Sequence, residues 1–452
     1  MKFKLIPQVR PTERLLVVGA GIAVAFLILC GWRLFDSDSA LVASLMGLSL
    51  WLVGAFALMV AWDAFRSDPQ TAYEAHRTLP NSFALNRTQR VVFELENKSD
   101  RVLQLRLNDG VPDHFECSQF PLHQRIETEQ VGRFEYSVKP KRRGLAEFEP
   151  AYVTIESRLG FWEHIRRLGG HSSAKVYPDF SAISNSFVFG VEQAMRNMGA
   201  HIAKRKGDGM EFNQLREFRE GDTLKQVDWK ATAKLGAPIS REYQEEKDQN
   251  IVFLLDCSRR MRAMEQDLSY FDYALNALLM SSYIALDKGD AVGVMSFSGE
   301  PSWLPPVKGK ANINTLLNHL YALSTSTQSS DYVTAAENLL VKQRKRSLVI
   351  VMTNVRDEDS QDLQQAVSIL SKQHLVMIVA LQERILDKVD EMTLDTQDDV
   401  LLYAGIKHFE HSRKKMLALL RAKGVSVVDA THKNLHVKLV SEYLRLKQFG
   451  RI

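Results

Sequence analysis

The sequence predicts a multidomain protein with a transmembrane helical hairpin at the N-terminus, a β-sandwich in the middle and a doubly wound α/β domain at the C-terminus. Three observations carry this prediction. Two uncharged apolar runs precede residue 63, short alternating strands follow Pro69, and strands alternate with helices from Ile251 onward. The expected parts are a hairpin (1–69), a sandwich (70–178), a connecting segment (179–250) and the α/β domain (251–452).

The hairpin prediction rests on two runs long enough to cross a bilayer. Residues 15–32 carry no charge, and about 18 apolar residues lie near the lower limit for a spanning helix. The second run, residues 40–62, is longer and also uncharged. We expect spans at about 15–34 and 40–62. Two runs in tandem, without a small-residue cleavage site, disfavour a cleaved signal peptide or a buried soluble helix.

The orientation of the hairpin follows from its flanking charges. The link at residues 36–39 is acidic, whereas basic residues precede the first span at Lys2, Lys4, Arg10 and Arg14. The positive-inside rule therefore places the N-terminus in the cytosol, and the second crossing returns the chain there. We expect a multi-pass protein of the bacterial inner membrane, with the lipid bilayer as a partner and the bulk of the chain cytosolic.

Composition excludes some functions. The formal net charge is only +4, and basic residues are interleaved with acidic ones, so no nucleic-acid partner is expected. The three cysteines, Cys30, Cys117 and Cys257, show no metal-ligand or redox spacing. We expect buried thiols rather than a disulfide framework.

The middle of the chain alternates apolar and polar residues in short runs. Strands are expected near residues 90–96, 102–107, 132–138 and 151–156, separated by turn-forming residues. Several strands at this spacing favour an antiparallel sandwich. From their composition, Arg142–Gly144 and Ser157–Phe161 are interpreted as solvated loops.

The C-terminal part alternates buried-strand and helix patterns, which is typical of a sheet covered by helices on both faces. Strands are expected at 251–255, 291–297, 348–352, 375–380 and 425–428, and helices at 270–286, 313–323, 332–341, 363–370, 409–422 and 434–449. We expect the last helix to pack onto the sheet. Ligands of such sheets bind at the carboxyl ends of strands, where Asp256 and Thr353 fall.

The residues after the first of these strands, Asp256-Cys257-Ser258-Arg259-Arg260, resemble the metal-ion-dependent adhesion site of von Willebrand factor A (vWA) domains, which opens Asp-x-Ser-x-Ser. The resemblance implies a vWA-like fold. It also implies a magnesium site that takes Asp256, Ser258, a hydroxyl such as Ser330, and the residue at position 354. Oxygen ligands of this kind suit a hard divalent cation.

Two positions depart from that pattern. Arg260 stands where the family has a serine, and Asn354 stands where it has an aspartate. Both changes add positive charge or remove negative charge, so the guanidinium of Arg260 could pair with Asp256 in place of a cation. Arg260 could instead face solvent, with Asp331 or Asp357 as substitute ligands. Asp256 could also cap the following helix. We expect no cofactor, and leave magnesium at a degenerate site as the alternative.

The connecting segment alternates charged and aromatic residues. Its notable positions are Gly207, Gly209, Glu211, Phe212, Arg216, Gly221, Asp222, Asp228 and Trp229. From chemistry alone, Asp222, Asp228 and Trp229 form either a catalytic cluster or a buried polar cluster that locks domains together. We favour locking because no nucleophile and base pair is evident.

These same positions resemble the DUF58 family, whose pattern runs Gly-x-Gly-x-Glu-Phe, Leu-Arg-x-Tyr-x-x-Gly-Asp and Ile-Asp-Trp-x-x-Ser-Ala-Arg. The resemblance implies a partner, because such proteins are commonly encoded beside a MoxR-type AAA+ ATPase. It predicts a membrane-anchored adaptor, not an enzyme, that works with this ATPase on a client protein. The chain has no Gly-x-x-x-x-Gly-Lys-Ser/Thr run, so any ATP hydrolysis belongs to the partner.

Two alternatives to the adaptor stay open. A structural factor in cell-envelope assembly would fit a chain whose bulk lies outside the cytosol. A metal-dependent hydrolase would use Asp256 with Asp222 or Asp228, but no histidine lies near these carboxylates in the sequence.

Overall fold

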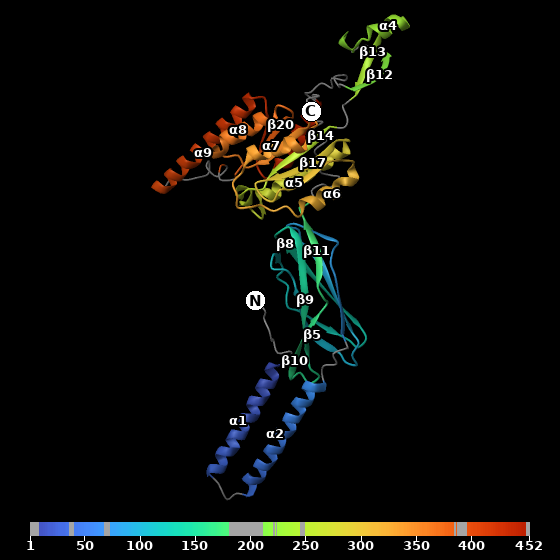
Figure 1. The fold of residues 1–452 in the computed structure, drawn as a ribbon. Helices are drawn as coiled ribbons and strands as arrows, with labels where there is room; N and C mark the ends of the chain where they lie inside the picture. The colour runs from blue at the N-terminus through green and yellow to red at the C-terminus, as the bar shows by residue number, and fades with distance from the viewer. Residues whose placement is uncertain are drawn as a thin grey trace. The chain divides into compact units, whose positions relative to one another are not determined.

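The computed structural model describes the chain over residues 9–35, 40–66, 73–179, 211–219, 222, 224–244, 249–383, 386 and 396–448. The chain divides into two compact units, Met1–Val176 and Tyr177–Ile452, and each is described by itself (Figure 1).

The first unit begins with two apolar helices, α1 (Glu13–Phe35) and α2 (Ala40–Arg66), drawn in blue in Figure 1. Both are long and apolar enough to cross a membrane, and the protein buries none of their most apolar windows. Large side chains such as Leu27 and Leu58 are 67% and 74% exposed. Such exposure is expected of surfaces that face lipid. The two predicted apolar helices are confirmed, and they indicate membrane association. The predicted link at 36–39 lies outside the described residues.

The start of α1 is attached to the sheet that follows. Strand β1 (Val9–Pro11) pairs antiparallel with β10 (Trp162–Leu168). The hydroxyl of Thr12 then donates to the carbonyl oxygen of Gly160 at 2.7 Å. Three residues before the first span are therefore already part of a sheet.

The end of α2 contacts the same region through Asp63, whose side chain is fully buried. Its carboxylate accepts hydrogen bonds from the hydroxyl of Ser157 at 2.5 Å and from the backbone N–H of Leu159 at 3.1 Å. The indole N–H of Trp162 donates to the carbonyl oxygen of Val60 at 2.9 Å. We name these contacts the Asp63 joint. The interpretation of residues 157–161 as a solvated loop is wrong for Ser157 and Gly160, which are buried because the helices cover them.

The rest of the first unit consists of two antiparallel sheets. Within the described residues, a seven-stranded sheet holds β1, β10, β9, β11 and β3 in order, with β5 beside β9 and β7 beside β5, and a four-stranded sheet runs β2-β4-β8-β6. The bounds are β2 Tyr73–Thr78, β3 Ser82–Ala84, β4 Gln89–Asn97, β5 Leu103–Gly110, β6 Phe115–Glu116, β7 Leu122–Ile126, β8 Val131–Pro140, β9 Gly144–Glu156 and β11 Ser172–Tyr177. The prediction of a strand-rich middle is confirmed.

Aromatic rings join the two sheets. Phe115 on β6 lies edge-on to Phe83 on β3 and to Phe148 on β9, with ring centroids 5.2 and 5.5 Å apart. The alternating burial along β4 and β8 supplies the rest of this core, because every second side chain points inward. We call this part the two-sheet domain.

One buried ion pair lies within that apolar core. Arg77 of β2 pairs with Asp109 of β5, and both side chains are fully buried. The hydroxyl of Tyr136 also donates to Asp109. Burial first, and then the neighbouring Asp109 carboxylate, raise the pKa of Tyr136. A buried charge is tolerated when it is paired and hydrogen-bonded in this way.

The second unit contains a six-stranded sheet within the described residues, in the order β18-β17-β14-β19-β20-β21. Its strands are β14 Asn250–Asp256, β17 Ala291–Phe297, β18 Trp303–Lys308, β19 Leu348–Thr353, β20 Leu375–Leu381 and β21 Ser426–Ala430. All neighbours are parallel except β18, which pairs antiparallel with β17 at the edge. The sequence did not predict β18, since its Pro305-Pro306 pair reads as a turn, although an edge strand tolerates proline.

Helices cover both faces of this sheet (Figure 1). Alternate side chains of β14 divide between the faces: Ile251 and Leu255 pack with α5, α6 and α10, whereas Val252 and Leu254 pack with α7, α8 and α9. The bounds are α5 Tyr270–Asp287, α6 Ile313–Leu320, α7 Tyr332–Lys342, α8 Ser360–Leu370, α9 Gln397–Ala422 and α10 Leu435–Gln448. A mixed α/β fold is confirmed.

Helix α10 is fixed to the sheet by a buried ion pair. The ammonium of Lys447 lies 2.7 Å from both carboxylate oxygens of Asp290, at the start of β17, and the hydroxyl of Tyr443 donates to the same carboxylate at 2.5 Å. The apolar face of α10, including Leu435 and Leu439, is buried against the sheet. The prediction that the last helix packs on the sheet is confirmed.

Replacing Lys447 by methionine tests this attachment. The substitution leaves the carboxylate of Asp290 buried without a cation, with only the hydroxyl of Tyr443 and the backbone N–H of Gln249 as donors in the described part of the chain, so the free energy of unfolding should fall by about 3–5 kcal/mol. The control is Arg445→Gln on the same helix, which removes the half-exposed Arg445–Glu442 pair and should cost about 0–1 kcal/mol. Urea unfolding of the full chain in detergent measures both, and equal losses would contradict the assignment.

Candidate functional site

The candidate site lies at the carboxyl end of the central strand β14 and is organised by Asp256. One oxygen of its carboxylate accepts from the backbone N–H of Ser258 at 2.9 Å. The other accepts from the hydroxyls of Ser330 at 2.9 Å and of Thr353 at 2.7 Å. The hydroxyls of Ser330 and Ser258 lie 3.0 Å apart. Asp256, Ser258 and Thr353 are fully buried, and Ser330 is 9% exposed.

Backbone hydrogen bonds bring these distant residues together. The N–H of Cys257 donates to the carbonyl oxygen of Phe297 at 2.9 Å, and the N–H of Arg259 donates to that of Gln328 at 2.9 Å. The carbonyl oxygen of Cys257 in turn accepts from the N–H of Ser326 at 2.7 Å. The turn after β14 is thus held to the loop at 326–328, which places Ser330 beside Asp256.

The carboxylate of Asp256 has hydrogen-bond donors but no cation beside it within the described residues. Burial raises the pKa of Asp256, and the hydrogen bonds from Thr353, Ser258 and Ser330 only partly oppose this effect. Burial, and then the charge of Asp256, also raise the pKa of Tyr332 to about 12. The hydroxyl of Tyr332 shares a 2.8 Å hydrogen bond with Thr353, so four hydroxyls surround one carboxylate.

Arg260 does not pair with Asp256. Its guanidinium lies 2.7 Å from the carboxylate of Glu358 and also pairs with Asp359, on the 3-10 turn η5 (Asp357–Asp359). The hypothesis that this guanidinium takes the place of a cation at Asp256 is therefore wrong. The sequence offered no sign of the true partner, because Glu358 lies 98 residues away.

Asn354 is bonded elsewhere as well. Its amide N–H donates to the carboxylate of Glu383 at 2.9 Å, and Arg356 donates to the same oxygen at 2.8 Å. Of the four candidate ligands, Asp256, Ser258 and Ser330 meet, whereas no hydrogen bond joins Asn354 to them in the described part of the chain. The proposed substitute ligand Asp331 instead accepts from the N–H of Thr334 and so caps helix α7.

This donor set does not fit a tightly held divalent cation. Magnesium favours six oxygen ligands with carboxylates among them, but both oxygens of the Asp256 carboxylate already accept protein hydrogen bonds. The described residues also contain no group of three or more His, Cys, Asp or Glu side chains arranged to hold a metal ion. What Asp256 can do here is fix the loops around it.

The connecting segment folds as a small antiparallel ribbon, β12 (Glu211–Glu217) with β13 (Ile239–Gln244), joined through the 3-10 turn η2 (Leu224–Gln226) and helix α4 (Trp229–Leu235). Glu211, Phe212 and Arg216 belong to β12. Gly207, Gly209 and Gly221 lie outside the described residues.

Asp222 and Asp228 of this segment each bind a guanidinium. Arg216 donates to both oxygens of Asp222 at 2.7 and 2.8 Å, and this pairing, together with the N–H of Arg219, lowers the pKa of Asp222 to about 2. Asp228 caps α4 through the N–H of Ala231 and accepts from Arg241 at 2.8 Å. Trp229 is 68% exposed, so it belongs to no buried cluster. Asp222 and Asp228 hold the ribbon together locally.

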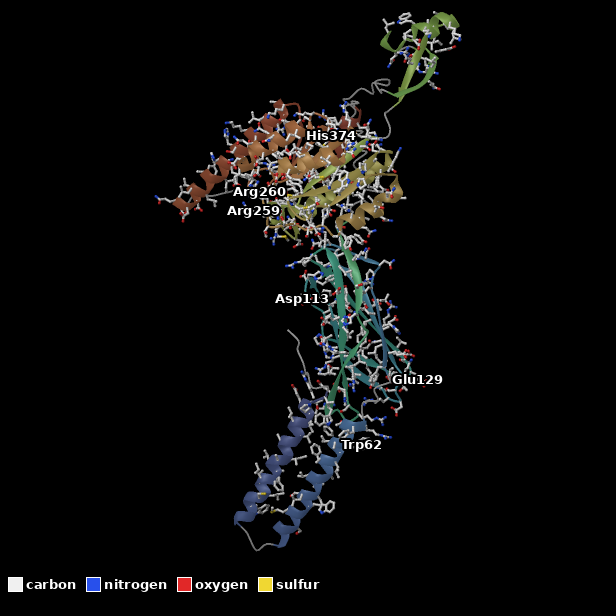
Figure 2. All side chains as sticks on the ribbon, in the orientation of Figure 1. Trp62, Asp113, Glu129, Arg259, Arg260 and His374 are labelled. Carbon is white, nitrogen blue, oxygen red and sulfur yellow. The ribbon has the colours of Figure 1, made fainter. Side chains whose placement is uncertain are left out.

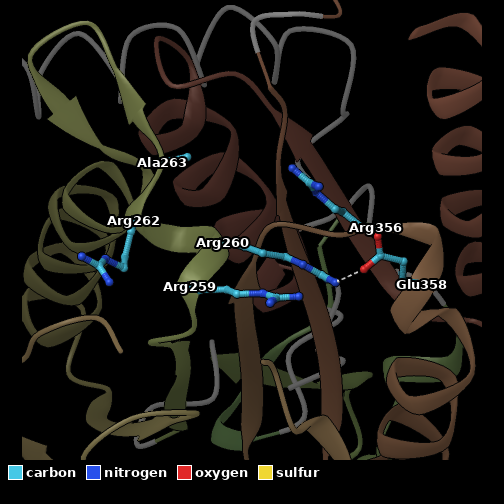
Figure 3. Close-up of a pocket in the computed structure, with 6 residues that line it drawn as sticks. All are labelled: Arg259, Arg260, Arg262, Ala263, Arg356 and Glu358. Atoms are coloured by element: carbon cyan, nitrogen blue, oxygen red, sulfur yellow. Dashed lines mark hydrogen bonds and ion pairs between the residues drawn. The ribbon is translucent and has the colours of Figure 1, made fainter. Parts of the chain in front are cut away.

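A pocket that the sequence reasoning missed opens beside the turn after β14. It has a volume of about 510 Å³ and is lined by Arg259, Arg260, Arg262, Ala263, Arg356 and Glu358, which we call the arginine pocket (Figure 3). Figure 2 places Arg259 and Arg260 on the α/β unit. The Arg-Arg-Met-Arg run that follows Asp256-Cys257-Ser258 is the sequence feature that could have indicated this pocket, but the comparison with the adhesion site draws attention to Arg260 alone.

Asp256→Asn tests the electrostatics of the site. Because the pKa of Asp256 is raised above its usual 3.8, the folded state loses stability as pH rises from about 3.8 through the folded pKa. Asparagine does not titrate, so the melting temperature of the variant should gain on that of the wild type as the pH rises above 3.8. Thermal unfolding of the full chain measures both, and a difference in melting temperature that stays constant with pH would contradict the analysis.

Comparison with known proteins identifies one family. Residues 214–408 match the family described as "Protein of unknown function DUF58". No curated protein matches the chain.

Three solved structures resemble parts of the chain. An aerotolerance-related membrane protein from Bacteroides fragilis is 18% identical over 29% of this chain and 67% of its own, with a TM-score of 0.23. The PapD-like domain 7 of human CEP192 is 18% identical over 24% of this chain and 87% of its own, with a TM-score of 0.19. Proximal thread matrix protein 1 from the mussel byssus is 13% identical over 43% of this chain and 46% of its own, with a TM-score of 0.24.

The segment 214–408 runs from the Arg216–Asp222 pair through Asp256 into α9, so most of the ribbon, the buried carboxylate and the arginine pocket lie in the part of the chain that is similar to DUF58 proteins.

Proposed function

We propose that this chain is a membrane-anchored adaptor that binds a partner protein at the carboxyl end of its α/β sheet. The observation that carries the proposal is the Asp256 cluster. Its hydrogen bonds hold the turn after β14, the loop that carries Ser330 and the end of β19 together, and this is the end of such sheets where ligands bind. Asp256, Ser258 and Ser330 follow the order that vWA domains use, and we propose a vWA-like fold for the domain.

The proposed partner is a MoxR-type AAA+ ATPase acting on a client protein. The match of residues 214–408 to DUF58 supports it, since proteins of that pattern are commonly encoded beside such an ATPase. An adaptor also agrees with the chemistry of the acidic residues. Asp222 and Asp228 are each bound by an arginine, which disfavours the alternative of a hydrolase that uses them with Asp256.

We further propose that the chain is a multi-pass protein of the bacterial inner membrane with its bulk in the cytosol. The two apolar helices support two crossings, and the basic residues before the first helix support an N-terminus in the cytosol.

Reporter fusions test this topology. Green fluorescent protein fused after Ile452 should fluoresce and alkaline phosphatase at the same place should be inactive, because each reporter works on one side of the membrane only. The same reporters inserted at residues 36–39 should give the reverse result and serve as the control. Active phosphatase after Ile452 would overturn the cytosolic assignment and favour a factor in envelope assembly.

Affinity purification tests the partner. The full chain, solubilised in detergent with a slowly hydrolysed ATP analogue, should recover a AAA+ ATPase. Gln328→Trp places a bulky side chain on the exposed loop beside Ser330 and should lower this recovery at least about tenfold, the effect of losing about 1.4 kcal/mol of binding. Ser368→Trp on the exposed side of α8 is the matched control and should bind as the wild type does. Equal recovery with both variants, or no ATPase at all, would contradict the proposal.

A further inference from the structure

The arginine pocket carries more positive charge than the protein neutralises. Four arginines line it, whereas only Glu358 among the lining residues is acidic. Asp359 pairs with Arg260, and Glu383 pairs with Arg356. The four arginines together with the carboxylates of Glu358, Asp359 and Glu383 carry a net charge of +1. A surface pocket with unneutralised guanidinium groups is a binding site for an anion.

The four arginines differ in how firmly they are held. Arg260 is 9% exposed and pairs with Asp359, which is 14% exposed, so the guanidinium group of Arg260 is held in one orientation. Arg356 is held by Glu383 at 2.8 Å and lies over the ring of Phe409. Arg259 and Arg262 are exposed, and their side chains have no ion-pair or hydrogen-bond partner in the described part of the chain. The pocket therefore combines fixed and uncommitted guanidinium groups.

Glu358 already places a carboxylate in this pocket. Its oxygen lies 2.7 Å from the guanidinium of Arg260, and its side chain is 63% exposed. Figure 3 shows Arg259 and Arg260 extending in the same direction, toward Glu358, and Arg356 above Glu358 in this view. An ion pair this exposed contributes only about 0–1 kcal/mol, so an incoming carboxylate can displace Glu358 at little cost. Asp359 keeps Arg260 in position meanwhile.

We propose that the arginine pocket binds an acidic side chain of a partner protein, and that Glu358 occupies this position when the partner is absent. The inference rests on the proposed adaptor function and names the chemistry that the partner presents. A carboxylate is favoured over a phosphate because the pocket already holds a carboxylate, that of Glu358, on the guanidinium of Arg260.

Fluorescence anisotropy with labelled hexaglutamate tests the pocket, using the full chain in uncharged detergent at low salt. Arg259→Gln should weaken binding about tenfold, because a charge-assisted hydrogen bond contributes about 1.5–3 kcal/mol and tenfold corresponds to about 1.4. Arg421→Gln, at an exposed arginine in the last turn of α9, is the matched control and should change binding less than twofold. Failure of the wild type to bind, or equal binding by both variants, overturns the proposal.

A second pair of variants tests the role of Glu358. Glu358→Gln removes the competing carboxylate and should tighten hexaglutamate binding about threefold or more, in keeping with an exposed pair of up to about 1 kcal/mol. Asp357→Asn makes the same charge change one residue away, on an exposed side chain without a contact to Arg260, and should have a smaller effect. Equal effects of the two variants would show that only the overall charge of the region matters, and would overturn the proposal that Glu358 occupies the position of the partner's carboxylate.

Two further arms separate the outcomes. Displacement of hexaglutamate by inorganic phosphate at lower concentration than by acetate would overturn the carboxylate assignment. Arg259→Gln in the affinity purification separates this inference from the proposed function. If a variant that no longer binds hexaglutamate still recovers the ATPase at the wild-type level, the pocket is not the docking site, whereas the proposed adaptor function is unaffected. Hexaglutamate binding without any recovered ATPase would support the pocket as a carboxylate site and contradict the proposed adaptor function.

Discussion

The arrangement of the α/β domain depends on a single buried carboxylate that has no counter-ion within the described residues. Asp256 gathers hydroxyl donors that lie 74 and 97 residues further along the chain, at Ser330 and Thr353. A carboxylate removed from water must satisfy its oxygens with protein donors, so the two loops and the end of β19 that supply them are held in one arrangement. The turn that follows directly carries Arg259 and Arg260 outward. The buried hydrogen bonds thus determine where the surface charge is presented.

The same residue type behaves in opposite ways at two places. Asp222 is bound by both arms of Arg216, and its pKa is lowered, whereas burial without a cation raises the pKa of Asp256. The sequence shows an aspartate beside basic residues in both cases, with Arg259 and Arg260 near Asp256. Local spacing does not determine pairing, because Arg260 turns away to a 3-10 turn on another loop. Charge near in sequence is therefore a poor guide to charge near in space.

Much of the fold could be predicted from the sequence, because buried strands and helices place apolar residues at regular intervals along the chain. Strand β17 runs over the residues 291–297 that its apolar run predicts, and α5 and α10 begin and end within one residue of expectation. Further strands of the middle domain, among them β2, β7, β10 and β11, were not predicted. Other missed elements lack such a signal: β1 has three residues, β18 contains two prolines, and the ribbon of β12 and β13 alternates charge rather than burial. In the site, Asp256, Ser258 and Ser330 were named from the resemblance to the adhesion site of vWA domains, and they lie together. The partners of Arg260 and Asn354 depend on tertiary contacts that no spacing encodes.

The Asp63 joint has a mechanical consequence for the membrane anchor. Strand β1, which precedes α1, pairs with β10. Helix α2 contacts the same region through the buried carboxylate of Asp63 and through its backbone, to which the indole of Trp162 donates, so both helices are attached to the same end of the two-sheet domain. A helix pair in a thinner or thicker bilayer changes its tilt to match the hydrocarbon. In the proposed transmembrane arrangement, these contacts would transmit such a tilt to the two-sheet domain, so the direction in which the domain faces would depend on the thickness of the bilayer.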